Sequence, residues 1–177
     1  MGSHISLPRR TGRNAEVRAA LDALRRLVQG IRTHAAQAER STGLSGAQLF
    51  VLQQLAEAPA QSLNELAART RTHQSSVSTV VTRLVERRLV SRRRAADDGR
   101  RLLLEVTQTG RALLAGAPES AQSRLIAALE ALPTARRRSL VRDLGELVAA
   151  LGMDREPPAL FLEPPERPGP AGGRPHR

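Results

Sequence analysis

The sequence has no cysteine, tryptophan or tyrosine, and only two of its 177 residues are phenylalanine. Without cysteine there is no disulfide, thiolate zinc site, cysteine nucleophile or thiol redox sensor. So few aromatic rings exclude the stacking platforms on which single-strand-binding proteins hold bases. The apolar runs, such as 102–104 and 147–151, are far shorter than the ~20 residues that cross a bilayer. We therefore expect a cytoplasmic protein with no membrane partner.

Signals for metal binding or catalysis are also missing. The four histidines are scattered, without the His-x-x-His or His-x-x-x-His spacing of metal ligands. The sequence contains no Gly-x-x-x-x-Gly-Lys loop, no Gly-x-Gly-x-x-Gly and no Gly-x-Ser-x-Gly. The sequence predicts no metal, no cofactor and no enzymatic activity.

Positive charge is abundant and is supplied by arginine alone. The chain has 28 basic and 17 acidic residues, a net charge of +11. Eleven arginines and only four acidic residues fall between Arg69 and Arg111, so +7 of the total lies in this quarter of the chain. Arginines that neutralise phosphates release condensed counterions, which favours duplex DNA as the partner.

The hydrophobic content, 40%, is enough for one compact domain or for a small domain with a helical extension. From Asn14, apolar residues recur at alternating spacings of four and three, which predicts a long helix with a narrow apolar seam that ends near Gly43. The seam fits two interpretations equally, a helix that pairs with a second chain or one that packs on its own core. Its members are Val17, Leu21, Leu24, Val28, Ile31, Ala35 and Ala38.

Two capping patterns predict the next helices. Ser45 precedes Gln48 by three positions, and Ser62 precedes Glu65 in the same way, each ahead of apolar residues. The second of these helices has only two turns and a tight turn must follow it. Beyond the turn, a fourth helix is predicted to bury Val77, Val80, Val81, Leu84 and Val85.

Two short strands, 89–94 and 102–107, are separated by turn-forming residues and predict a hairpin. Helical stretches follow, divided at Pro118 and Pro133, and the last one ends at Gly152. After Arg155 the chain holds seven of its eleven prolines, a composition that predicts a disordered tail.

A short helix, a turn, a second helix and a hairpin form a winged helix-turn-helix, which inserts its second helix into the major groove of DNA. Small hydroxyl side chains on that helix allow close approach to bases, Gln pairs with adenine, and Arg binds guanine or phosphate. The alternative is an ordinary solvated helix face. The candidate recognition residues are Gln74, Ser75, Ser76, Ser78, Thr79 and Arg83.

Four segments resemble the MarR (multiple antibiotic resistance regulator) family over roughly residues 14–151. They are 44–52, 63–67, 75–84 and, above all, 98–110, where an Asp-x-Arg in the wing precedes a strand and a Thr-x-x-Gly helix start. The resemblance implies a homodimeric transcription factor, here expected to be a repressor, that binds a pseudo-palindromic duplex. It also implies that Asp98 orients a wing arginine through a salt bridge, that Arg100 reaches the minor groove, and that Arg94 and Arg101 contact the DNA backbone.

These features together predict a mainly α chain with a two-stranded β wing and five segments. They are a flexible amino terminus (1–13), a dimerisation helix (14–43), the winged helix-turn-helix domain (44–107), carboxy-terminal dimerisation helices (108–153) and a disordered Pro/Gly/Arg-rich tail (154–177). The residues expected to form the dimer are Val17, Leu21, Leu24, Val28, Leu140, Leu144, Leu147 and Leu151.

The family resemblance further implies a small-molecule effector bound between the dimer helices and the DNA-binding lobe. Because Tyr and Trp are absent, we expect aliphatic surface and Arg32, His34 or Arg40 to hold it. Where the family usually has glycine after the recognition helix, this chain has Arg88, and a positive φ there would cost about 1 kcal/mol.

Two other functions remain open from the sequence. A surplus of arginine gives affinity without readout, so a non-specific architectural DNA-binding protein is one alternative. A winged-helix module that binds an acidic protein partner is the other, because the same fold and charge serve both uses.

Overall fold

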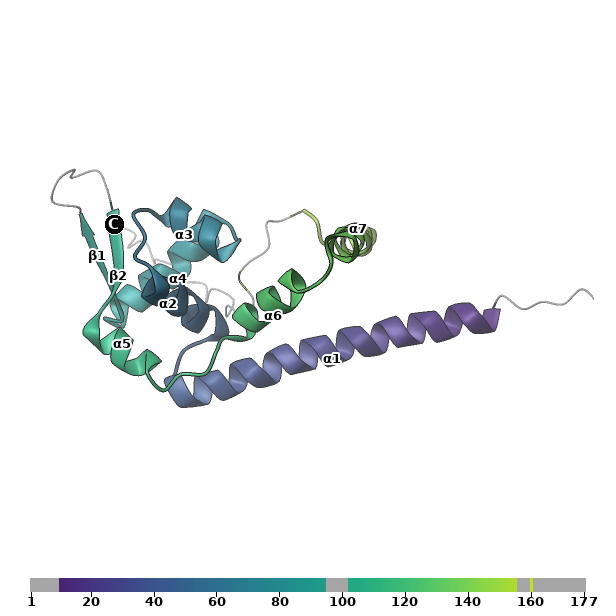
Figure 1. Cartoon of the computed structure of the whole chain (residues 1–177), viewed down its shortest axis with the longest axis horizontal. Helices are drawn as coiled ribbons and strands as arrows, with labels where there is room; N and C mark the ends of the chain where they lie inside the picture. The colour runs from purple at the N-terminus through teal and green to yellow at the C-terminus, as the bar shows by residue number, and fades with distance from the viewer. Residues whose placement is uncertain (1–9, 95–101, 156–159, 161–177) are drawn as a thin grey trace, which may run out of the picture.

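A computed structural model describes residues 10–94, 102–155 and 160 of the chain. The described part is mainly helical with one two-stranded antiparallel sheet, which confirms the predicted fold class (Figure 1). In chain order the elements are α1 (Arg10–Thr42), α2 (Gly46–Glu57), α3 (Leu63–Thr70), α4 (Gln74–Glu86), β1 (Val90–Arg94), β2 (Leu102–Val106), α5 (Gln108–Leu114), α6 (Ala121–Glu130) and α7 (Thr134–Ala150).

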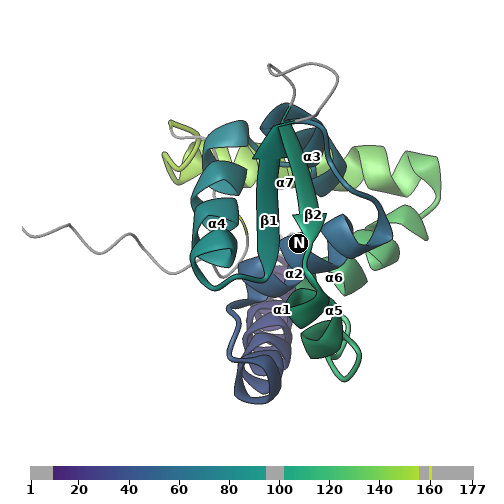
Figure 2. The same ribbon diagram turned by 90° about the vertical axis from the view of Figure 1, so that its left-hand side faces the viewer.

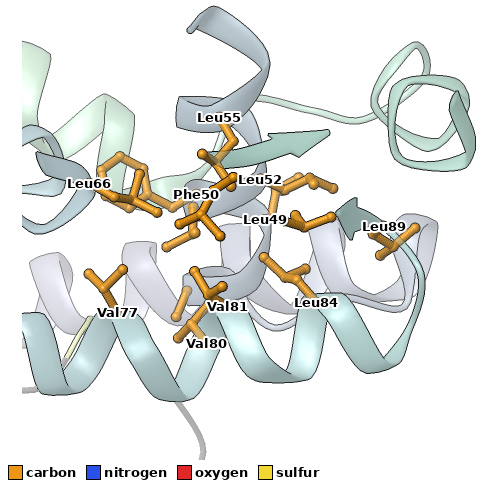
Figure 3. Close-up of a cluster of buried hydrophobic side chains, with 14 of the residues drawn as sticks. Leu49, Phe50, Leu52, Leu55, Leu66, Val77, Val80, Val81, Leu84 and Leu89 are labelled. Atoms are coloured by element: carbon orange, nitrogen blue, oxygen red, sulfur yellow. The ribbon is translucent and has the colours of Figure 1, made fainter. Parts of the chain in front are cut away.

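The hydrophobic core lies inside the lobe formed by α2, α3, α4 and the sheet. Of the five residues predicted to form the buried face of α4, Val85 is half-buried and the other four are at most 2% exposed. They point from α4 toward α2 and α3, where Phe50, Leu52 and Leu66 meet them (Figure 3). Burial on this scale, roughly 1.5–3 kcal/mol for each large apolar side chain, fixes α4 on the lobe. Its opposite face is left outside.

The predicted helix caps are confirmed, with one difference in detail. The Ser45 side chain accepts a hydrogen bond from the Gln48 amide, and Gln48 Oε1 accepts one from the Ser45 amide, a complete capping box. Ser62 caps α3 by accepting from the Glu65 amide at 3.0 Å. The Glu65 carboxylate, however, binds the Gln61 amide at 2.7 Å, one residue before the cap.

Both strands of the sheet contact the helix-turn-helix. β1 and β2 pair in the register Val90 to Val106 through Arg94 to Leu102, within one residue of the predicted strands. Ala60, in the connection between α2 and α3, forms a bridge with Leu104 through two backbone hydrogen bonds of 3.1 and 2.8 Å. The wing therefore shares backbone pairing with the helix-turn-helix, and α4 lies beside β1 (Figure 2).

The predicted break at Pro118 separates α5 from α6. Gln53, on α2, fixes this break: its Nε2 donates to the Pro118 carbonyl at 2.8 Å and its Oε1 accepts from the Ser120 amide at 3.1 Å. Ser120 is buried and caps α6 by accepting from the Ser123 amide. The next break falls where Pro133 was predicted to interrupt the chain, and Gly152 ends the last helix with a φ of 65°.

Two predicted boundaries were wrong. α1 begins at Arg10 and not at Asn14, because extending an existing helix costs little per residue and the sequence of its first turn has no apolar residue to mark it. Leu160, in the segment predicted to be a disordered tail, is 4% exposed and belongs to the hydrophobic core. The average composition of a segment does not reveal that one of its leucines packs into an apolar site.

Candidate nucleic-acid interface

The turn before α4 sets the direction of that helix. Arg71 ends α3 in the left-handed conformation, with a φ of 53°, and its amide donates to the Ala68 carbonyl at 3.2 Å. The Thr72 amide donates to the Ala67 carbonyl at 3.0 Å, so the last turn of α3 is closed by a pair of backbone bonds. The chain then reverses within three residues and α4 starts at Gln74.

The outer face of α4 carries the predicted recognition residues. Gln74 and Ser75 are exposed, and the other four predicted residues are partly exposed. Thr82, which is also exposed, donates its hydroxyl hydrogen to the Ser78 carbonyl at 2.9 Å, so its oxygen lone pairs remain available as acceptors. The cap residue His73 makes no side-chain bond to the helix, and the first turn contains no acidic residue. The amino-terminal amides therefore face solvent with their positive partial charge.

The wing adds arginines beside this face. Arg92 and Arg93 are exposed, and their cross-strand partners are the buried Leu104 and the half-buried Leu103. Because cross-strand partners share a face, Arg92 emerges from the row that covers the core and Arg93 from the opposite row. The Arg94 side chain and the predicted wing residues Asp98, Arg100 and Arg101 lie outside the described residues.

A junction behind the wing explains the Thr-x-x-Gly pattern. Thr107 caps α5 by accepting from the Gly110 amide at 3.1 Å, and its hydroxyl lies 2.8 Å from the Arg88 carbonyl. Gly110 packs so closely on the Leu89 carbonyl that a Cβ atom would overlap it. Arg88 adopts a φ of 58°, so arginine occupies the left-handed position where the family usually has glycine. Sequence analysis found the pattern but not this contact.

Several arginines in the basic quarter bind the protein itself. Arg69 donates to the carbonyls of Gln54, Ala58 and Pro59 and pairs with Glu65 at 2.7 Å, which ties α3 to the end of α2.

Arg87, which ends α4, donates to the Gly43 carbonyl at 2.6 Å, and Arg71 pairs with Glu130 at 2.5 Å. The net charge of the segment includes all eleven arginines, but Arg69, Arg71 and Arg87 already have partners within the protein.

The apolar seam of α1 is divided into a buried part and an exposed part. Ala35 and Ala38 are buried on the chain's own core, whereas the four residues predicted to form the dimer are 37–52% exposed. On α7, the predicted dimer residues Leu144, Leu147 and Leu151 are exposed and Leu140 is half-buried. α1 is 33 residues long, about 50 Å, and most of its length projects from the lobe (Figure 1).

The three predicted effector residues do not come together. Arg32 lines a hollow of about 450 Å³ on α1 with Leu21, Leu24 and Val28. His34 lines a different hollow, of about 290 Å³, between α1 and α6, where its Nδ1 lies 2.8 Å from the Gly30 carbonyl oxygen. Arg40 is exposed and lines neither of them. Residues two apart on a helix point to nearly opposite sides, which separates Arg32 from His34.

Two searches of the described residues were negative. None of their helices combines the length and the apolar character that a membrane span requires. They also contain no cluster of three or more His, Asp or Glu side chains placed to hold a metal ion.

A short helix, a left-handed turn, an anchored second helix and a two-stranded wing define a winged helix-turn-helix protein. A model of the MarR family matches residues 42–101. Solved structures agree: a MepR-like protein complexed with pseudoligands has a TM-score of 0.51 at 21% identity, over 77% of this chain and 94% of that one. A MarR/EmrR family transcriptional regulator from Acinetobacter sp. ADP1 has a TM-score of 0.50 at 18% identity, covering 78% and 96%.

A probable transcriptional regulator from Pseudomonas aeruginosa is 33% identical over 71% of this chain and 93% of that chain, with a TM-score of 0.46. No curated protein matches the sequence. The chain belongs to the MarR family and has the fold of its transcriptional regulators.

Proposed function

We propose that the protein is a homodimeric transcriptional repressor that binds a pseudo-palindromic site in duplex DNA through α4 and the wing. The observation that carries the proposal is the α4 surface: its apolar side is buried, and its outer side presents amide, hydroxyl and arginine groups beside the arginines of β1. Amide and guanidinium groups read base edges, and small side chains allow the backbone to come close. Family membership supports this use of the fold.

The proposed DNA-binding residues fall into two groups, those that contact base edges and those that contact phosphates. Gln74, Ser75 and Ser78 are the residues we propose to meet base edges in the major groove, with Ser76, Thr79 and Arg83 beside them. Arg92 and Arg93 are placed to bind the phosphate backbone, which supplies affinity without sequence information. We extend this role to Arg94, Arg100 and Arg101, and propose that Asp98 orients an arginine of the wing.

The exposed apolar faces of α1 and α7 support a homodimer. A face that carries Val17, Leu21, Leu24 and Val28 over about three turns is costly to leave in water, and monomers rarely show such contiguous apolar surface. A second copy supplies the same faces, and two-fold symmetry places the two α4 helices toward successive major grooves, about 34–36 Å apart.

Binding to DNA is tested by a gel-shift titration at two salt concentrations, with the region upstream of the gene and a random duplex. We expect tighter binding to the upstream region. Arg92→Ala should weaken binding to both duplexes and reduce the salt slope by about 0.9 for each protomer of the dimer, whereas Arg142→Ala, at an exposed arginine on α7, should change neither the affinity nor the slope. Gln74→Ala should reduce only the preference for the specific site.

The same titration separates the alternatives. Equal affinity for both duplexes would indicate a non-specific architectural protein. No duplex binding at low salt, for a folded dimer, would contradict the proposal and leave an acidic protein partner as the function.

The dimer is tested by the mass in solution. Leu21→Asp places a charge in the exposed seam and should reduce the mass to that of one chain, measured by light scattering after gel filtration. Ala19→Asp is the matched control because residue 19 lies on the opposite side of the same helix. A single-chain mass for the unmodified protein would contradict the dimer.

Release by a small effector rests on family membership and on the hollows along α1. Arg32 and His34 line different hollows, so we propose that any effector contacts one of them together with the second copy. Reduced release of DNA by an identified effector in either Arg32→Ala or His34→Ala, but not in both, would support this arrangement.

A further inference from the structure

Arg71 lies in the turn that precedes the proposed recognition helix, and its side chain has a protein partner. It lies in the turn three residues before α4 begins. Its Nη2 is 2.5 Å from Oε1 of Glu130, the last residue of α6, and the two residues are separated by 59 positions in the sequence. Both side chains are 57% exposed. The pair thus links the helix-turn-helix to the carboxy-terminal helices across solvent-accessible surface.

The backbone of Arg71 is held independently of Glu130. Two backbone hydrogen bonds hold the turn to α3, from the amides of Arg71 and Thr72 to carbonyls in the last turn of that helix. Thr70 is fully buried, and its hydroxyl donates to the Leu66 carbonyl at 2.8 Å. Changing the partner of the guanidinium therefore requires rotation of the side chain alone.

The backbone of Glu130 is also held independently of the ion pair. Arg137 donates to the Glu130 carbonyl at 3.1 Å and to the Leu132 carbonyl at 3.5 Å, which fixes the corner between α6 and α7. A hollow of about 380 Å³ borders the pair, lined by Arg71, Ile126, Leu129, Glu130 and Arg137. The guanidinium has room to leave the carboxylate without disturbing the packing of either helix.

We propose that Glu130 competes with DNA phosphate for Arg71. The inference rests on the proposed DNA binding and adds a specific restraint to it. Exposed ion pairs are weak, so the carboxylate weakens the binding of Arg71 to a phosphate but does not prevent it. Glu130, far from α4 in sequence, thereby lowers the affinity for duplex DNA, and any shift of the corner between α6 and α7 changes how much of Arg71 is available.

The test is a double-mutant cycle on duplex binding, measured over a range of salt concentrations. For each protomer of the dimer, Glu130→Gln should strengthen binding by up to about fivefold and steepen the salt dependence by up to about 0.9, which corresponds to one phosphate contact. Arg71→Gln should weaken binding. In the Arg71→Gln background, Glu130→Gln should have no more effect on binding than Glu146→Gln, which removes a different exposed carboxylate, located on α7.

The outcomes separate the two proposals. An equal gain from Glu130→Gln in both backgrounds would mean that the acid acts at long range as a charge, and the inference would fail. An unchanged or weaker affinity in Glu130→Gln, at unchanged thermal stability, would also overturn it while the proposed function stood. If the unmodified protein binds no duplex in the same titration, both fail together.

Discussion

Gly110 is the position where adding a single methyl group should be most damaging. A Cβ atom built on Gly110 overlaps the Leu89 carbonyl oxygen and lies 2.7 Å from Val106 Cγ1. Carbon atoms in contact stay about 3.5–4.0 Å apart, so the end of β2 or the start of α5 must move by roughly 1 Å. The displaced groups include the Thr107 hydroxyl, which bridges to the carbonyls of Arg88 and Leu89 at 2.8 and 3.2 Å.

The cost follows from these contacts. Overpacking of this kind costs about 1–3 kcal/mol and a lost hydrogen bond about 1 kcal/mol, against which the better helix propensity of alanine returns less than ~1 kcal/mol. Gly110→Ala should therefore reduce the free energy of unfolding by about 2–3 kcal/mol.

The assay is thermal unfolding at one fixed protein concentration, because dimers melt at temperatures that depend on concentration. Each kcal/mol corresponds to roughly 2–4 °C for a chain of this size, so a decrease of about 4–12 °C is expected. Gly145→Ala is the control, since a Cβ on this α7 glycine meets no atom within 4 Å and should leave the protein equally or more stable. If Gly110→Ala melts no lower than Gly145→Ala, the close approach is not real.

Two further substitutions test the same lobe. Arg88→Gly should stabilise the protein by about 1 kcal/mol in urea unfolding, because glycine adopts the φ of 58° without the strain of a side chain, whereas Arg88→Ala should give no such gain. Leu160→Ala should cost about 2–4 kcal/mol in the same assay, because it empties a buried site, while Met153→Ala, at an exposed position, should stay within about 0.5 kcal/mol of the unmodified protein. Equal effects at positions 160 and 153 would show that Leu160 contributes nothing to the core.

The sequence predicted most of what is determined locally. Caps at Ser45 and Ser62, breaks at Pro118 and Pro133, and the period of the α4 core residues all depend on neighbours within a few positions, and the structure confirms them. The strands were placed within one residue because alternation and turn composition mark both ends.

Contacts between distant segments were not predictable in the same way. All three of Arg71, Arg87 and Arg92 are exposed, and nothing in the sequence indicates that Arg71 and Arg87 bind groups 59 and 44 residues away. Their partners are set by how α4 packs on the lobe. The effector residues were predicted as alternatives, Arg32, His34 or Arg40, and two of them, Arg32 and His34, line different hollows because residues two apart on one helix point to nearly opposite sides.

The bridge between Ala60 and Leu104 has a mechanical consequence. It joins the hairpin to the chain ahead of α3, while Thr107 joins the other end of the hairpin to the segment that follows α4, so the wing is attached to the helix-turn-helix lobe at two separate points. The wing and the helix-turn-helix lobe should therefore move as one rigid block. In a dimer, any change in the spacing between two such blocks would then arise outside them, where Gly43 bends the chain between the long α1 lever and the block it carries.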